Sequence, residues 1–366
     1  MRTLGILATS LLLTATLGML PGSTATAVPN ASDNGIDDGW KVKVVDDDQS
    51  FRGLDAVNRK VAWVSGGSTT GGAGRVFRTV DGGKTWDDVT PPGTGGLTLR
   101  DVEAPTARTA VVLSIGPGEA SRIYRTTDGG ATWTETFRNN DPAAFYNCLD
   151  FYPGGRRGLA VSDPVDGKFR IAATHDRGRT WQVLPDEGMP DSTGEYNFSA
   201  SGDCLVIAGH TAWFGSGGTS ARVFRSTDHG RTWDAEDSTL PAGEAAGVFA
   251  LAFRTPDDGV AVGGDFEAPG DGTDASAYTR DGRTWTNGGD LTHLAEDAAW
   301  LRGRRPVVVA VGEGADAAGT VFGGTSLSTD GGRSWRLVSE QRFHTLDCTP
   351  QRVCWAAGGG GRVGRW

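Results

Sequence analysis

Several carboxyl groups lie in segments that should connect strands, where they could act on a bound molecule. They belong to Asp163, Asp166, Glu195, Asp265, Glu267 and Glu313. Two carboxyl groups at a suitable separation are sufficient for glycoside hydrolysis, because one serves as the acid and the other as the base or nucleophile. On this ground the catalytic candidates are Asp163, Glu195 and Asp265, although no sharper motif selects two of them.

The same connections hold groups suited to recognition without a reaction. We expect Trp213 and Phe214 to form an exposed pair that gathers with the carboxyl groups, a mixture typical of sites for sugars or peptides. The ligand-binding candidates are Asp163, Asp166, Glu195, Tyr196, His210, Trp213, Phe214, Asp265, Glu267 and Glu313. A structural interpretation competes, since Asp163 before Pro164 and Asp265 after two glycines are good turn residues, and Trp213 would equally fill a hydrophobic gap.

A repeated phrase identifies the elements that must position these side chains. Ser/Thr-x-Asp-x-Gly-x-Ser/Thr-Trp occurs six times, the fifth copy being one residue short, and its aspartates are 47 to 53 residues apart. They are Asp81, Asp128, Asp176, Asp228, Asp281 and Asp330. This period fits one four-stranded blade of a β-propeller. In a tight turn Asp accepts backbone N–H groups and Gly takes positive φ, so the six aspartates are predicted to be structural.

Alternating segments before each phrase supply the other strands of a blade, for example 51–57, 61–65 and 75–79, with 87–90 after it. Six phrases complete six blades. Segments 343–347, 353–357 and 361–366 then make a seventh blade without its outer strand. Residues 40–45, after a degenerate phrase at 32–35, would supply that strand and close the ring. The prediction is an all-β, seven-bladed propeller.

The N-terminus predicts export. Met1 and Arg2, the apolar run 4–20 and the small residues 25–27 are typical of a signal peptide covering residues 1–27, with residues 28–366 as a single mature domain. No later run of 18 apolar residues predicts a membrane span. The formal charge of −10 argues against nucleic acid and anionic membranes as partners. We therefore expect a secreted, extracellular monomer.

Four cysteines in an exported chain favour disulfides. Cys348 and Cys354 flank a predicted turn in the last blade and form the clearer pair, whereas Cys148 and Cys204 are paired only by elimination. No residue pattern predicts a metal site or a cofactor site. There is no Cys-x-x-Cys or histidine cluster, and the single Gly-x-Gly-x-x-Gly match, 359–364, ends two residues before the C-terminus with no helix to seat a dinucleotide.

The repeated phrase resembles the Asp-box, or BNR repeat, of sialidases, sortilin-type receptors and xyloglucan hydrolases. The stretch from Gly158 to Asp265, with its Leu-Ala-Val-Ser-Asp-Pro at 159–164 and Ala-Trp-Phe-Gly at 212–215, is similar to secreted bacterial BNR-repeat proteins of the photosystem II assembly-factor (YCF) type. The resemblance implies that the Asp-boxes lie on the face opposite the binding site. Members of this group are often labelled oxidoreductases, which no residue pattern here supports.

Two functions follow as hypotheses. The first is a non-catalytic extracellular binding or assembly module whose face opposite the Asp-boxes holds a protein or a glycan. The alternative is a glycan-active hydrolase or lyase, similar to sialidase or xyloglucanase propellers, that uses the loop carboxylates. Against the alternative, the Arg-Ile-Pro element of sialidases is absent.

Overall fold

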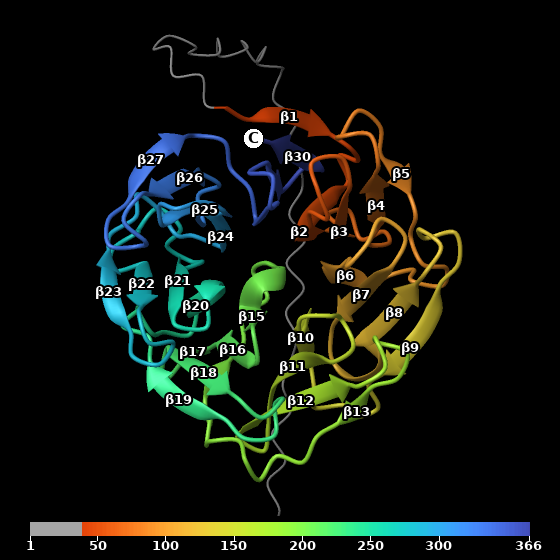
Figure 1. The fold of residues 1–366 in the computed structure, drawn as a ribbon, viewed down its shortest axis with the longest axis horizontal. Helices are drawn as coiled ribbons and strands as arrows, with labels where there is room; N and C mark the ends of the chain where they lie inside the picture. Colours follow the sequence, from red (N-terminus) through yellow and green to blue (C-terminus); the bar gives the residue numbers. More distant parts are fainter. Residues whose placement is uncertain (1–38) are drawn as a thin grey trace, which may run out of the picture. The chain divides into compact units, whose positions relative to one another are not determined.

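Seven antiparallel sheets surround a common centre in the computed structural model, which describes residues 39–366 (Figure 1). The predicted seven-bladed β-propeller is thus confirmed. Two sequence predictions, the signal peptide at 1–27 and the degenerate Asp-box at 32–35, lie outside the described residues.

Each blade has four strands, numbered here from the channel outward. Blade 1 contains β2 (Gln49–Asp55), β3 (Ala62–Ser68), β4 (Val76–Thr79) and β5 (Asp87–Asp88); blade 2 contains β6 (Thr98–Glu103), β7 (Ala110–Ile115), β8 (Arg122–Thr126) and β9 (Thr134–Arg138); blade 3 contains β10 (Tyr146–Phe151), β11 (Gly158–Val165), β12 (Lys168–Thr174) and β13 (Gln182–Val183). Blade 4 contains β15 (Leu205–Ala208), β16 (Thr211–Gly215), β18 (Arg222–Ser226) and β19 (Asp234–Asp237).

The remaining blades follow the same plan. Blade 5 contains β20 (Ala246–Thr255), β21 (Asp258–Asp265), β22 (Ser276–Thr279) and β23 (Thr286–Gly289); blade 6 contains β24 (Asp297–Leu301), β25 (Val307–Ala315), β26 (Val321–Ser328) and β27 (Arg336–Ser339); blade 7 contains β28 (Thr345–Cys348), β29 (Cys354–Ala357), β30 (Arg362–Arg365) and β1 (Lys41–Val44). Two short strands, β14 (Glu195–Tyr196) and β17 (Gly217–Gly218), extend the sheet of blade 5, and η1 (Gly118–Ala120) and η2 (Gly202–Cys204) are single 3₁₀ turns.

The outer strand of blade 7 comes from the other end of the chain. β1 pairs antiparallel with β30, in a register that places Lys41 opposite Arg365 (Figure 1). The indole of Trp40 packs against Phe343 and Trp366, with ring centroids 4.9 and 5.6 Å away, and donates a hydrogen bond to Thr325 Oγ1 at 3.0 Å. The N-terminal strand therefore completes the ring and covers the edge that β30 would otherwise expose.

Apolar side chains fill each joint between neighbouring blades. The described residues form seven buried clusters, one for each joint, and each cluster draws its members mainly from two adjacent blades. Asp-box tryptophans take part: Trp86 packs edge-on against Trp355 of blade 7, and Trp133 against Trp63 of blade 1. Burial of apolar surface between blades thus supports the whole ring, so no single large core is needed.

Five of the six Asp-box turns share one hydrogen-bonding scheme, and the turn at Asp128 keeps it except for the first of its two backbone N–H bonds. In blade 4, Asp228 Oδ1 accepts from the N–H groups of Arg231 and Thr232, at 3.0 and 2.9 Å, and Oδ2 accepts from the Thr232 hydroxyl at 2.7 Å. The shortened fifth copy keeps these bonds through Arg283 and Thr284. In blade 1, the N–H of Thr85 and other donors around Asp81 lower the pKa of that carboxyl to about 2. The charged aspartate therefore holds each turn together through its hydrogen bonds.

We expect Asp228→Ala to destabilise the fold by about 1–2 kcal/mol, because it leaves two turn N–H groups without their acceptor. Chemical denaturation measures this loss, and Asp228→Asn, which keeps one acceptor oxygen, should lose less. Ligand binding measured on folded protein should not change. A folded Asp228→Ala protein that no longer binds its ligand would place the binding site on the face of the ring that carries the Asp-box turns.

Both disulfides expected from the sequence are present, Cys148–Cys204 and Cys348–Cys354. The second closes the turn between β28 and β29. The first joins the inner strand of blade 3 to the η2 turn that leads into the inner strand of blade 4. Among residues 39–366, no helix is long and apolar enough to cross a membrane.

Candidate functional site

The strand order gives the ring two distinct faces. Turns from the first to the second strand of a blade and from the third to the fourth, which are the Asp-box turns, lie on one face, here called the Asp-box face. Hairpins from the second to the third strand and the connections between blades lie on the other, here called the open face. Most of the candidates lie on the open face as expected: Asp163, Asp166, Glu195, Tyr196, Asp265, Glu267 and Glu313.

The prediction that Trp213 and Phe214 form an exposed aromatic pair is wrong. Trp213 and Phe214 lie in β16, and both side chains are 0% exposed. Trp213 stacks on Phe253 at 3.8 Å and donates its indole N–H to the carbonyl of Gly282 in the next Asp-box turn, while Phe214 stacks on Phe224 at 4.5 Å. A second strand is covered on both faces by neighbouring blades, so consecutive large apolar residues are buried on both sides of it.

His210 is exposed, but it lies on the wrong face for the predicted site. It belongs to the tight hairpin between β15 and β16, in which Ala208 pairs with Thr211. This is a first-to-second-strand turn and therefore lies on the Asp-box face. The sequence prediction placed His210 in a connection together with Trp213 and Phe214, whereas only residues 209 and 210 form the turn.

Asp163 holds two segments together at the end of β11. Its Oδ1 accepts hydrogen bonds from the Asn147 side chain at 3.0 Å and from the backbone N–H of Asn197 at 2.9 Å. Burial raises the pKa of this carboxyl to about 6, although the two donors oppose that rise. The side chain thus positions the connection between blades 3 and 4.

Glu195 is also committed to a structural contact. Its carboxylate is 4% exposed and forms an ion pair with Arg222, with Oε1 at 2.5 Å from Nη2 and Oε2 at 3.2 Å from Nε. The Ser216 hydroxyl donates to Oε2 at 2.6 Å. Both oxygens are occupied, so the residue joins β14 to β18 and has no free oxygen for a proton transfer.

The other carboxylates of the open face differ in exposure. Asp265 Oδ1 accepts from the N–H of Glu267 at 2.8 Å and so stabilises its own turn, whereas Glu267 points into solvent. Asp166 is the tip of the hairpin between β11 and β12, at φ 54° and 93% side-chain exposure. Asp166 and Glu267 are therefore the candidates whose carboxylates are most accessible.

Glu313 belongs to a charged network that spans blades 6, 7 and 1. It accepts from Arg362 at 2.7 Å and from the N–H of Gly359 at 3.1 Å. Beside it, buried Glu296 accepts from His344 Nδ1 and from Arg52, both at 2.6 Å. The network satisfies buried charges between blades, as charges removed from water require.

Arg52 also reaches across the channel. Its Nη1 donates to the carbonyl of Ala200 at 2.7 Å, although Ala200 precedes blade 4. The segment 197–204 turns into the channel, and its η2 turn contacts the inner strands of blades 1, 2, 3 and 5. Figure 1 shows this coiled turn, just before β15, in the middle of the ring. The Cys148–Cys204 disulfide fastens it to blade 3. This segment fills part of the channel.

A second set of carboxyl groups, absent from the sequence predictions, joins the inner strands to one another. At five of the seven joints between blades, an aspartate on an inner strand accepts a hydrogen bond from one backbone N–H group of the following blade. The donor and acceptor residues are Ala104 and Asp55, Leu149 and Asp101, Ile207 and Asp150, Leu346 and Asp297, and Ala56 and Asp347, at 2.5 to 2.9 Å. Burial raises the pKa of Asp101 to about 8 and those of Asp150 and Asp297 to about 7.

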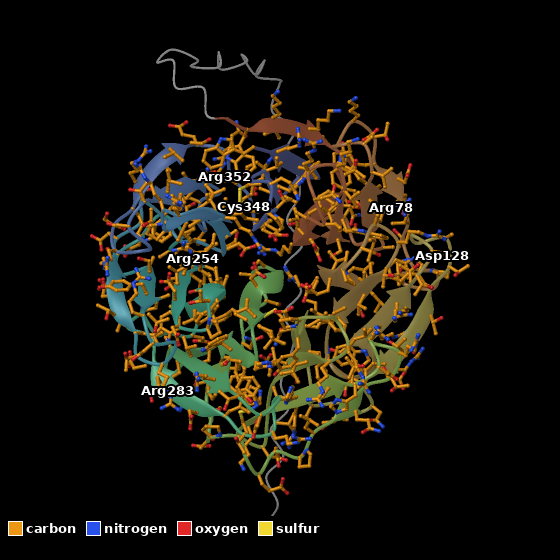
Figure 2. The ribbon with its side chains drawn as sticks, in the orientation of Figure 1. Arg78, Asp128, Arg254, Arg283, Cys348 and Arg352 are labelled. Atoms are coloured by element: carbon orange, nitrogen blue, oxygen red, sulfur yellow. A yellow bond between two sulfur atoms is a disulfide. The ribbon has the colours of Figure 1, made fainter. Side chains whose placement is uncertain are left out.

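A cavity of about 470 Å³ lies at the Asp-box end of the channel. Its lining includes Asp203 and Asp347, Arg254 and Trp300. Arg254 and Cys348, which also lines it, are labelled in Figure 2, together with Asp128 at the periphery of blade 2. None of the ten predicted ligand residues contributes to this cavity, so the candidate site on the open face is separate from it.

Aromatic side chains do reach solvent on the open face, but from other residues than Trp213 and Phe214. Tyr196 is 48% and Phe266 is 50% exposed. The half-buried Phe198 packs edge-on against Phe266 at 5.8 Å and against the buried Phe249 at 5.4 Å. Tyr196 was among the predicted residues, whereas Phe198 and Phe266 were missed, although Phe266 stands beside Asp265 and Glu267 in the sequence.

The arrangement is better suited to contact than to proton transfer. Of the three catalytic candidates, Glu195 is ion-paired, Asp163 is hydrogen-bonded to two segments and Asp265 stabilises its own turn. Within the part of the chain that the structure describes, no three His, Cys, Asp or Glu side chains are placed to hold a metal ion. The open face exposes aromatic rings among acidic loops.

No protein-family model and no curated protein matches this sequence. Solved structures are similar in fold. YCF48 bound to a D1 peptide superposes with a TM-score of 0.60 and 15% identity, over 93% of this chain and 99% of that one. YCF48 from Cyanidioschyzon merolae gives 0.58 and 16%, over 89% and 98% of the two chains. The Pan2 WD40 domain of Neurospora crassa gives 0.56 and 11%, over 89% and 94%. The chain is therefore a seven-bladed β-propeller similar in fold to YCF48 and to the Pan2 WD40 domain.

Proposed function

We propose that this chain is an exported, non-catalytic binding or assembly propeller whose open face holds a protein partner. The proposal rests on a contrast between the carboxylates and the aromatic rings of that face. Its catalytic candidates are engaged in structural contacts, whereas Tyr196 and Phe266 expose about half of their side chains. Exposed aromatic rings held by a rigid scaffold are typical of protein-binding surfaces.

Two further findings support the proposal. A propeller of similar fold, YCF48, has been solved with a D1 peptide bound, so a propeller of this kind can hold a peptide. The two disulfides suit an oxidising compartment outside the cytosol, in line with the signal peptide expected at residues 1–27.

Glycan binding is the second candidate function. The exposed ring of Phe266 lies between Asp265 and Glu267 in the sequence, and sites for sugars combine aromatic rings that stack on the sugar with carboxylates that hydrogen-bond its hydroxyl groups. The two functions differ in the probe that binds, so one experiment separates them.

We expect the mature protein to select binders from a displayed library of random peptides, and to lose them in the double variant Tyr196→Ala/Phe266→Ala. The Asp-box variant Asp228→Ala is the matched control and should keep them. A glycan array is screened in parallel. Failure to select any peptide, selection unaffected by the double variant, or binding restricted to sugars would each contradict the proposed protein-binding face.

A further inference from the structure

The exposed rings belong to a surface built from four neighbouring connections of the open face. We call it the aromatic–acidic surface and define it by Tyr196, Phe198, Phe266, Glu244, Asp265 and Glu267. Backbone hydrogen bonds join its parts: Gly218 N donates to the carbonyl of Gly243 at 3.0 Å, and Phe266 N donates to the carbonyl of Ala245 at 3.0 Å. These bonds therefore hold the connections next to one another.

The aromatic part of this surface is rigid. Phe198 lies between Phe266 and the buried Phe249, so the exposed ring of Phe266 is linked through ring contacts to the interior of blade 5. Glycines lie beneath the rings. A Cβ atom at Gly217 would come within 2.3 Å of the Phe198 ring, and one at Gly218 within 3.2 Å of the Tyr196 ring. A partner would thus meet rings fixed against bare backbone, at little cost in side-chain ordering.

Charge on these connections is of one sign. Segments 191–201, 216–221, 238–246 and 265–275 contain no Lys, Arg or His. Their acidic residues are Asp191, Glu195, Glu244, Asp265, Glu267, Asp271 and Asp274. Only Glu195 is neutralised by an ion pair within the described residues, the one with Arg222. Carboxylates without an ion-pair partner around exposed rings attract a partner of positive charge and disfavour one of negative charge.

We infer that the aromatic–acidic surface binds a segment of a partner protein in which apolar side chains alternate with Lys or Arg. The apolar side chains would pack on Tyr196, Phe198 and Phe266, and the basic ones would reach Glu244, Asp265 and Glu267. This inference rests on the proposed function and specifies the chemistry of the partner at that same face.

The inference is tested with three short fluorescent peptides titrated into the mature protein: one alternating Lys and Leu, one alternating Glu and Leu, and one alternating Lys and Ser. Fluorescence anisotropy is followed at low and at physiological ionic strength. The Lys–Leu peptide should bind most tightly. The Glu–Leu peptide tests whether positive charge is needed. The Lys–Ser peptide keeps that charge and lacks apolar side chains, so it shows how much binding comes from attraction to an acidic protein alone.

Two double variants separate the contributions of the surface. Tyr196→Ala/Phe266→Ala should weaken Lys–Leu binding about tenfold or more, since exposed aromatic anchors dominate such interfaces. Glu244→Gln/Glu267→Gln should weaken it and reduce its dependence on salt. The control Val183→Ala/Glu236→Gln removes an exposed apolar and an exposed acidic side chain from outer strands and should change nothing. Circular dichroism checks that each variant folds. If Tyr196→Ala/Phe266→Ala does not fold, Glu244→Gln/Glu267→Gln alone decides whether the surface binds the peptide.

Some outcomes would overturn the inference without touching the proposed function. Equal binding of the Lys–Leu and Lys–Ser peptides, or binding insensitive to both variants, would show attraction by net charge alone. Library-selected peptides that are acidic or uncharged, yet need Tyr196 and Phe266, would retain the protein-binding face but reject the basic partner. Binding of oligosaccharides alone would reject both.

Discussion

A chain that lacks residues 28–46 should not form a cooperative propeller. The deletion removes β1 from blade 7, so β30 loses its antiparallel partner and presents an open edge. It also removes Trp40 from its place between Phe343 and Trp366, and loss of a buried Trp alone costs about 3–5 kcal/mol. The expected result is aggregation or loss of the melting transition, an effect larger than that of any single Asp-box substitution.

The matched control for this deletion is a chain that begins at Gly39 and keeps β1. It should melt like the mature protein, because the strand pairing with β30 and the Trp40 contacts are retained. Differential scanning calorimetry compares the three proteins. A chain without residues 28–46 that melts as cooperatively as the control would show that β1 is not needed to close the ring.

The melting temperature should fall as the pH rises from about 5 to 8, through the inner-strand carboxyl groups. Burial raises the pKa values of Asp150 and Asp297 to about 7 and that of Asp101 to about 8. Between the pKa of an unfolded aspartate, near 4, and these values, the folded state binds more protons than the unfolded state. The free energy of unfolding therefore decreases across this window, in total by on the order of a few kcal/mol.

The Asp-box carboxyls titrate with the opposite sign and in another range. Hydrogen bonds lower the pKa values of Asp81 and Asp128 to about 2, so their contribution is fully present above the unfolded pKa and is lost only in acid. Asp101→Asn keeps an acceptor for the Leu149 N–H and removes one titrating group, so it should flatten the decline between pH 5 and 8. The exposed control Asp257→Asn should not. Stability that rises from pH 5 to 8 would contradict the assignment.

The architecture was predictable because its signals are local and repeated. The Asp-box fixes one turn in each of six blades, and the strands before it alternate with period 2, so the predicted segment 75–79 corresponds to β4 (Val76–Thr79). The N-terminal strand expected at 40–45 corresponds to β1 (Lys41–Val44), because the seventh blade visibly lacked its outer strand. Short loops also made the Cys348–Cys354 disulfide evident.

The candidate site was harder to predict because its contacts join residues distant in the sequence. Trp213 and Phe214 were taken for loop residues, since a short apolar run beside Gly209 and His210 gives no clear period. The connection 184–204 has no repeat to align it, so neither the entry of 197–204 into the channel nor the bond from Arg52 to Ala200 could be anticipated. The exposure of Phe266 depends on blade 5 hydrogen bonds that no local pattern indicates.

Hydrogen–deuterium exchange of the mature protein, with and without its strongest library-selected peptide, tests the central claim most directly. If the open face holds the partner, protection should appear in segments 191–201, 238–246 and 265–275, and the Asp-box turns should exchange at unchanged rates. Protection confined to the Asp-box turns, or to the cavity lined by Arg254 and Trp300, would show that the partner binds the other face.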